Sequence, residues 1–105
     1  TPMSKPVLYH VAIEVRNLAG AVTWYRDNFD VNVLYQGETW ALLGFDNTAL
    51  ALVTPGEHPP HIAVEHPFAD NFGKLVRHRD GTQSIYVHDP AGNAVEIVKT
   101  ERNHS

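Results

Sequence analysis

The sequence predicts a single α+β domain, residues 1–105, made of two βαβββ-type modules, the second with a shortened helix. The alternating segment HVAIEV, which begins at His10, returns as HIAVEH at His61. Each copy precedes further segments of strand character, and an amphipathic helical pattern follows the first copy. Two copies are too few for a solenoid. We therefore expect a pseudo-symmetric pair of small sheets that forms a curved mixed sheet around a shared cleft.

Module one is expected over about residues 7–54. Residues 7–15 alternate between two faces, which is the period of a strand. Asn17 is a candidate N-cap, because its side chain can accept from free amides of the first turn. The helix it begins should cover residues 18–29, with apolar residues at helical spacing. Strands are expected over residues 31–36, 40–45 and 48–54, with a hairpin turn at 46–47.

Module two is expected over about residues 61–99. His61 opens a strand with the same alternation as the first. Residues 67–72 leave room for about one helical turn. Three strands should follow, over residues 74–79, 84–88 and 94–99, joined by turns at 80–81 and 90–93.

Composition restricts the class of partner. The formal net charge is −4 with eight Lys and Arg, so too little positive charge is present for a nucleic-acid surface or an anionic membrane. The chain has no cysteine, no signal-peptide pattern and no apolar run of about 20 residues. We expect a cytoplasmic protein with a small-molecule substrate. A homodimer is expected too, because a chain this short buries only about two-thirds of its unfolded surface.

Two histidines and one carboxylate are candidate metal ligands. His10 lies opposite the apolar strand face that the helix must cover, and the repeat puts His61 in the equivalent place. Alternation in the last strand puts Glu96 on the same side. A single strand histidine is more often structural than a ligand. Matched histidines beside the small residues Ala12 and Ala63 favour a metal, which would also offset the cost of burying Glu96.

These segments, together with Trp24–Tyr25 in the helix and the closing run YVHDPAGNAVE from Tyr86 to Glu96, resemble the vicinal oxygen chelate superfamily. This superfamily includes glyoxalase I, fosfomycin-resistance thiol transferases, methylmalonyl-CoA epimerase, bleomycin-resistance proteins and type I extradiol dioxygenases. The resemblance covers nearly the whole chain. It implies paired βαβββ modules around a divalent metal, with His10, His61 and Glu96 as ligands.

The fourth ligand position of the glyoxalases and the epimerase is missing. Those proteins take a Glu or Gln from the last strand of the first module, where this chain has Ala51. The remaining set of two histidines and one carboxylate leaves coordination positions open, an arrangement that suits Fe(II). Mn(II), as the likeness to the thiol transferases implies, Zn(II) and Ni(II) are also compatible.

The stretch from Val76 to Glu96 is similar to the signature of extradiol dioxygenases. The similarity implies catalytic roles for Tyr86 and His78 at the substrate hydroxyls or bound oxygen. A phenol near the metal can donate to an oxygen that gains negative charge. A packing role for Tyr86 and a solvated position for His78 remain as alternatives. Three further residues are expected to bind substrate: Ser84, His88 and Trp40.

The sequence thus predicts a divalent-metal-dependent enzyme, most similar to an extradiol dioxygenase, acting on a catechol-like small molecule. Two alternatives stay open. One is a fosfomycin-type thiol transferase, which also has a Ser and a Tyr two residues apart, or a glyoxalase-like lyase or isomerase. The other is a metal-free protein of the bleomycin-resistance type that sequesters a small molecule.

Overall fold

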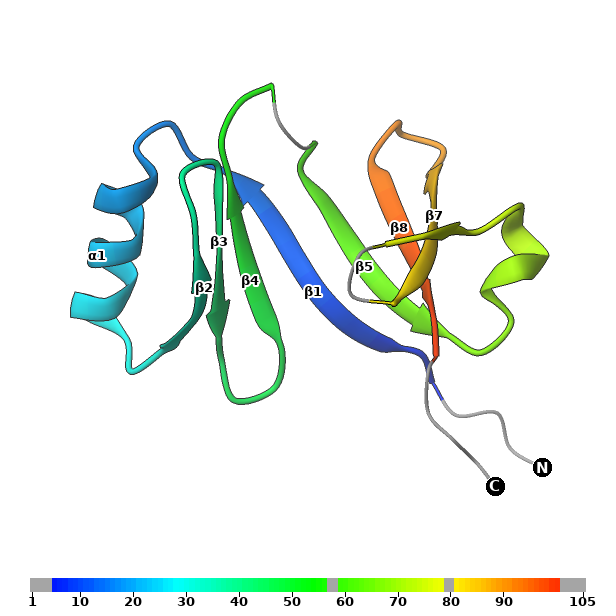
Figure 1. Ribbon diagram of the computed structural model, residues 1–105, viewed down its shortest axis with the longest axis horizontal. Coiled ribbons are helices and arrows are strands. Elements are labelled where there is room, and N and C mark those ends of the chain that lie inside the picture. The colour runs from blue at the N-terminus through cyan, green and yellow to red at the C-terminus, as the bar shows by residue number, and fades with distance from the viewer. Residues whose placement is uncertain (1–4, 57–58, 79–80, 101–105) are drawn as a thin grey trace. The chain divides into compact units, whose positions relative to one another are not determined.

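The computed structural model describes residues 5–56, 59–78 and 81–100. Its strands form one mixed sheet in the order β2-β3-β4-β1-β5-β8-β7-β6 (Figure 1). The predicted α+β class is confirmed. In chain order the elements are β1 (Val7–Glu14), α1 (Leu18–Asn28), β2 (Asn32–Gln36), β3 (Trp40–Gly44), β4 (Ala49–Val53), β5 (His61–His66), the 3-10 helix η1 (Ala69–Phe72), β6 (Val76–Arg77), β7 (Gln83–His88) and β8 (Ala94–Lys99).

The chain divides into two compact units. The first runs from His10 to His61, and the second joins the residues up to Tyr9 with those from Ile62 onward. The first unit holds α1, β2, β3, β4 and most of β1. The second holds β5 from Ile62 onward, η1, β6, β7, β8 and the start of β1.

In the first unit, α1 covers one face of β3 and β4 (Figure 1). The helix begins after Asn17, whose side chain accepts a hydrogen bond from the Gly20 N–H at 2.9 Å. Its buried residues Leu18 and Val22 pack with the fully buried Leu43 and Leu52. The predicted amphipathic helix and its N-cap are confirmed.

The opposite face of this unit carries small residues. Ala12 of β1 packs with Ala51 and Val53 of β4, and β1 and β4 are parallel, with Ala12 beside Ala51. Because side chains alternate along a strand, His10 shares this face with Ala12. The predicted division of β1 into a face under the helix and a face carrying the histidine is therefore correct.

The second unit has a reduced helix. The one helical turn predicted for residues 67–72 is the 3-10 helix η1. The strand predicted over residues 74–79 was too long, because β6 covers two residues only. The reason is an early turn: the His78 N–H donates to the Thr82 carbonyl at 2.7 Å, and the Gly81 N–H donates to the His78 carbonyl at 3.0 Å. Residues 79 and 80 of the predicted strand and turn lie outside the described residues.

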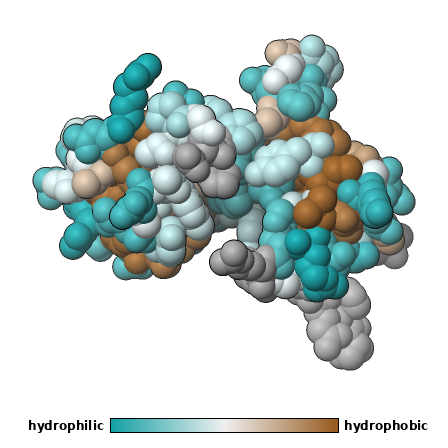
Figure 2. Space-filling model, turned by 45° about the horizontal axis from the view of Figure 1, so that its top comes forward, coloured by the Kyte–Doolittle hydropathy of each residue, from teal (hydrophilic) through white to brown (hydrophobic). Residues whose placement is uncertain are grey.

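Apolar residues also reach the surface (brown in Figure 2). None of the helices within residues 5–56, 59–78 and 81–100 is long and apolar enough to span a membrane. The large apolar side chains with the greatest exposure among these residues are Phe68, Val76, Leu34 and Trp24.

Candidate metal centre

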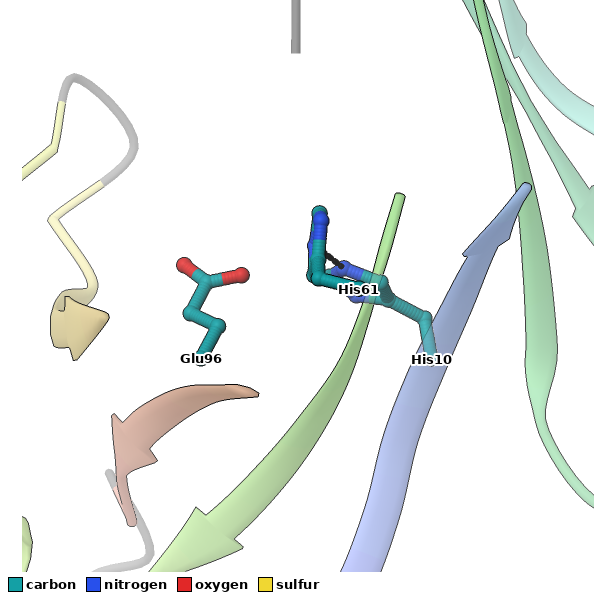
Figure 3. A group of neighbouring side chains, drawn as sticks. All are labelled: His10, His61 and Glu96. Atoms are coloured by element: carbon teal, nitrogen blue, oxygen red, sulfur yellow. Dashed lines mark hydrogen bonds between the residues drawn. The ribbon is translucent and has the colours of Figure 1, made fainter. Parts of the chain in front are cut away.

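His10 and His61 form a close pair. The two Nε2 atoms lie 3.0 Å apart, with the ring planes at 73°, and Figure 3 draws this contact as a dashed line. His10 comes from the middle of β1 and His61 from the first position of β5. The first residues of the two copies of the repeated segment, His10 and His61, are thus in contact, as the sequence predicts.

The tautomer of His61 is fixed by the backbone. Its Nδ1 lies 2.8 Å from the Pro59 carbonyl oxygen. A carbonyl can only accept, so Nδ1 carries a proton and Nε2 of the neutral ring carries a lone pair. This is the orientation in which protein histidines usually bind metals, with the other ring nitrogen donating to an outer partner. The partner is a main-chain atom, which a side-chain pattern does not reveal.

The spacing of the pair fits one ion. Two nitrogens that each bind a metal at about 2.1 Å, with about 90° between the bonds, lie about 3.0 Å apart. The observed Nε2–Nε2 separation is 3.0 Å. Without a metal, one imidazole must donate to the other, so His10 Nε2 carries the shared proton when His61 Nε2 does not. Metal binding would displace that proton.

Glu96 is buried within a hydrogen-bonded group of its own unit. It lies on β8 (Figure 3) and is 9% exposed. The Ser84 hydroxyl donates to Glu96 Oε2 at 2.8 Å, and His78 Nε2 lies 2.6 Å from the Ser84 oxygen. His78 Nε2 is also 3.8 Å from Glu96 Oε2. Ser84 is almost fully buried, at 1% exposure.

Tyr86 lies beside Glu96. The two residues face each other across the β7–β8 ladder. Burial, followed by the negative charge of Glu96 and a hydrogen bond to it, raises the pKa of Tyr86 to about 12. The phenol therefore stays protonated at neutral pH and remains a hydrogen-bond donor.

A tight turn sets the pairing of β7 with β8. Asp89 Oδ1 accepts from the Ala91 and Asn93 N–H groups at 2.9 and 2.8 Å, and Oδ2 accepts from the Asn93 side chain at 2.9 Å. Gly92 supplies a positive φ of 89°. The hydrogen bonds from Asn93 lower the pKa of Asp89. This turn holds the register that places Tyr86 opposite Glu96.

Ala51 occupies the position at which the resemblance places a fourth ligand in other proteins. It is 4% exposed and packs against Ala12. His10 and His61 in the first unit and Glu96 in the second are candidate ligands of a divalent metal. Two imidazoles and one carboxylate suit several first-row divalent metals.

The other predicted site residues fall into separate places. His78, Ser84 and Tyr86 gather around Glu96. Trp40 stacks on Tyr35 in the first unit, with ring centroids 4.4 Å apart. His88 is exposed at the last position of β7. The predicted substrate contacts of Ser84, His88 and Trp40 stay predictions.

No protein-family model and no curated protein matches the chain. Solved structures do. A glyoxalase/bleomycin resistance protein/dioxygenase superfamily member from Vibrio splendidus 12B01 aligns with a TM-score of 0.70 at 13% identity, over 91% of this chain and 100% of that one. A variant methylmalonyl-CoA epimerase of Streptomyces coelicolor, in complex with 2-nitronate-propionyl-CoA, gives 0.69 at 17% identity, over 97% and 99%.

The methylmalonyl-CoA epimerase of Mycobacterium tuberculosis aligns with a TM-score of 0.66 at 19% identity, over 91% of this chain and 89% of that one. Likeness at these identities concerns the fold. The chain has the fold of the glyoxalase/bleomycin resistance protein/dioxygenase superfamily, which confirms the resemblance at that level.

Proposed function

We propose that this chain is a divalent-metal-dependent enzyme of the vicinal oxygen chelate type, with His10, His61 and Glu96 as the metal ligands. The observation that carries the proposal is the histidine pair. Its Nε2 atoms are 3.0 Å apart, and the Pro59 carbonyl holds His61 in the ligand tautomer. Glu96 supplies the negative charge that a divalent ion needs from the protein.

The ligand set favours substrates with two adjacent oxygens. Ala51 cannot coordinate, so three protein ligands leave several positions for substrate. A bound metal would polarise the substrate oxygens and, as Fe(II), could also bind O₂. The finer proposal is therefore ring cleavage of a catechol-like diol with O₂. Fe(II) is the favoured metal.

Tyr86 is the proposed catalytic donor. Its hydroxyl is protonated at neutral pH, as an ordinary phenol is, and the rise of its pKa to about 12 extends this to alkaline pH. A hydroxyl at this place can stabilise a substrate oxygen that gains negative charge, once its proton turns from Glu96 to the substrate. Tyr86 is 43% exposed, so a small molecule can reach it.

The test is oxygen uptake by protein loaded anaerobically with Fe(II). With catechol and substituted catechols, we expect O₂ consumption that matches the amount of ring-opened product. His61→Ala, prepared in the same way, should consume none. If the protein binds Fe(II) tightly but consumes no O₂ with any of the diols, the proposed dioxygenase activity is wrong. The proposed metal site would still be supported.

A metal-free binding protein is the second candidate, and two observations favour it. His10 and His61 already hydrogen-bond to each other, so the pair is satisfied without an ion. The Tyr35–Trp40 stack, with Tyr35 45% exposed, offers an aromatic surface to a flat ligand. Under this reading, His61→Ala binds small aromatic compounds as well as the unaltered chain does, and neither protein takes up metal.

A further inference from the structure

We propose that the stacked rings of Tyr35 and Trp40 bind a second, flat part of the substrate, separate from the two oxygens that chelate the metal. This inference rests on the proposed function and deepens it, because it makes the substrate a two-part molecule. Tyr35 lies on β2 and Trp40 on β3, in the same unit as His10. Their ring centroids are 4.4 Å apart, with 29° between the ring planes.

The stack lies on the face of the sheet that carries His10. Trp40 packs against three buried residues of that face, Ala12, Ala51 and Val53. His10 shares the face with Ala12, because side chains alternate along β1. The stack and this proposed metal ligand are therefore on the same side of one sheet, within one unit.

The strand register separates the stack from His10. Trp40 pairs with Val53 and His10 pairs with Ala49, so the two levels are four residues apart along β4. This is about 13 Å along the strands, and the two spacings from β3 to β1 add about 10 Å across the sheet. One ring chelated at His10 does not cover such a distance. The two places fit the two ends of a longer molecule.

The face between these two places is apolar. On β3 and β4 its residues carry no polar side chain except the indole N–H of the stack itself: Trp40, Leu42, Gly44, Ala49, Ala51 and Val53. An apolar surface favours apolar groups, which it removes from water. The link between the chelating oxygens and the flat ring of the substrate should therefore be apolar too.

The stack is held in place and remains accessible. Tyr35 is 45% exposed although its ring lies against Trp40. A further flat ring can pack on it in an offset arrangement. The Gly37 N–H donates to the Trp40 carbonyl at 2.9 Å, and a Cβ added at Gly37 would collide with the Tyr35 hydroxyl oxygen. The position of the Tyr35 ring therefore depends on the absence of a side chain at residue 37.

Binding of catechols that carry a phenyl ring on a flexible linker tests the inference without measuring activity. The probes are catechol and 4-phenylalkylcatechols with linkers of about two to six carbons, a range chosen to cover the separation along the sheet. They are bound anaerobically to Zn(II)-loaded protein and followed by calorimetry. We expect the best linker to bind about threefold to tenfold more tightly than catechol, the gain that one aromatic pair supplies.

Three variants locate the source of this gain. Tyr35→Leu removes one ring of the stack, and Gly37→Ala keeps both rings but displaces Tyr35. Both should reduce each phenylalkylcatechol to about the affinity of catechol. Phe29→Leu is the matched control and should keep the gain, because Phe29 is an aromatic residue of the same unit, 48% exposed, that packs with Trp24 and Phe45.

Two results would overturn the inference and leave the metal site standing. One is a series in which no phenylalkylcatechol binds more tightly than catechol, and the other is an equal loss of the gain in Tyr35→Leu and Phe29→Leu. If the unaltered chain takes up no Zn(II), the proposed function fails, and this inference fails with it. Tyr35 and Phe29 are both exposed, so their variants should fold and keep the test decisive even if Gly37→Ala does not.

Discussion

His61 uses its two ring nitrogens for different purposes. Nδ1 donates to the Pro59 carbonyl, and Nε2 faces His10. The repeated segment was enough to predict which two histidines meet, because duplicated strands put equivalent residues on equivalent faces. It could not predict the tautomer, since that depends on a backbone oxygen in the preceding loop.

Tyr86→Phe separates catalysis from metal binding. The substitution removes one hydroxyl and leaves the ring that packs beside Glu96. Because the phenol is proposed to donate to substrate, we expect kcat to fall by about 10²-fold or more with the metal content unchanged. Steady-state kinetics together with metal analysis of the same sample measure both quantities.

Loss of metal from Tyr86→Phe would contradict this role, since it would make the tyrosine a support for Glu96. The pH profile offers a second check. With a pKa of about 12, Tyr86 stays protonated across neutral and mildly alkaline pH. In the metal-free chain, an absorbance titration should therefore find Tyr86 still protonated below about pH 11.

At the scale of elements, α1 was predicted almost residue by residue. Its N-cap, its buried stripe and its end near residue 29 all follow from local sequence. Phe29, expected as the last helical residue, is instead the C-cap, in extended conformation at φ −138° and ψ 152°. The helix therefore ends at Asn28, one residue before the predicted end. The spacing of apolar side chains does not determine the last residue of a helix.

Asn17→Ala tests the helix cap. The variant loses the acceptor for the Gly20 N–H and should lower the free energy of unfolding by about 1 kcal/mol. Urea denaturation followed by circular dichroism measures the change. Asn17→Asp keeps an acceptor oxygen and should stay within a few tenths of a kcal/mol of the unaltered chain. Equal losses in both variants would show that the cap is not the cause.

The stability that Asp89 contributes to the β7–β8 turn depends on pH. Its pKa is lowered in the fold, so it adds stability above its unfolded pKa of about 3.9 and loses it as pH falls through the lower folded value. Asp89→Ala should melt at a lower temperature than the unaltered chain at pH 7. The difference should narrow as the pH falls below about 4.

Calorimetry across this pH range makes the measurement. Asp89→Asn, which keeps one acceptor oxygen but no charge, shows how much of the difference comes from the carboxylate. A melting difference that is constant between pH 7 and pH 3 would mean that the charge of Asp89 does not stabilise the turn.

The sheet of the second unit was harder to predict. The candidate residues His78, Ser84 and Glu96 were found from patterns, but their contact was not. It depends on β6 and β8 pairing with opposite edges of β7, and on a turn that ends β6 at Arg77. Pairing partners and short edge strands leave little trace in local hydrophobic periodicity.

For the molecule as a whole, a short repeated segment was enough to predict the fold. The alternation of HVAIEV and HIAVEH, the single long helix and the turn residues all point to the same duplicated sheet. Structures with 13–19% identity share that fold. The same fold is therefore formed by chains in which most individual residues differ.

We also expect a homodimer, as predicted from the small size of the chain. Large apolar side chains remain exposed in both units, among them Leu34 at 57% and Phe68 at 61%. A second copy could cover some of this surface. Light scattering after size-exclusion chromatography should give twice the mass of the chain. A single-chain mass across the whole concentration range would contradict this expectation.

The central claim is that His10, His61 and Glu96 bind one metal ion. Metal analysis tests it most directly, on protein purified anaerobically, exposed separately to Fe(II), Mn(II), Zn(II) and Ni(II), and then freed of excess ion. We predict about one bound ion per chain for at least one of these metals, and none in His61→Ala. Failure of all four metals to bind near one per chain, or equal binding by His61→Ala, would contradict the claim.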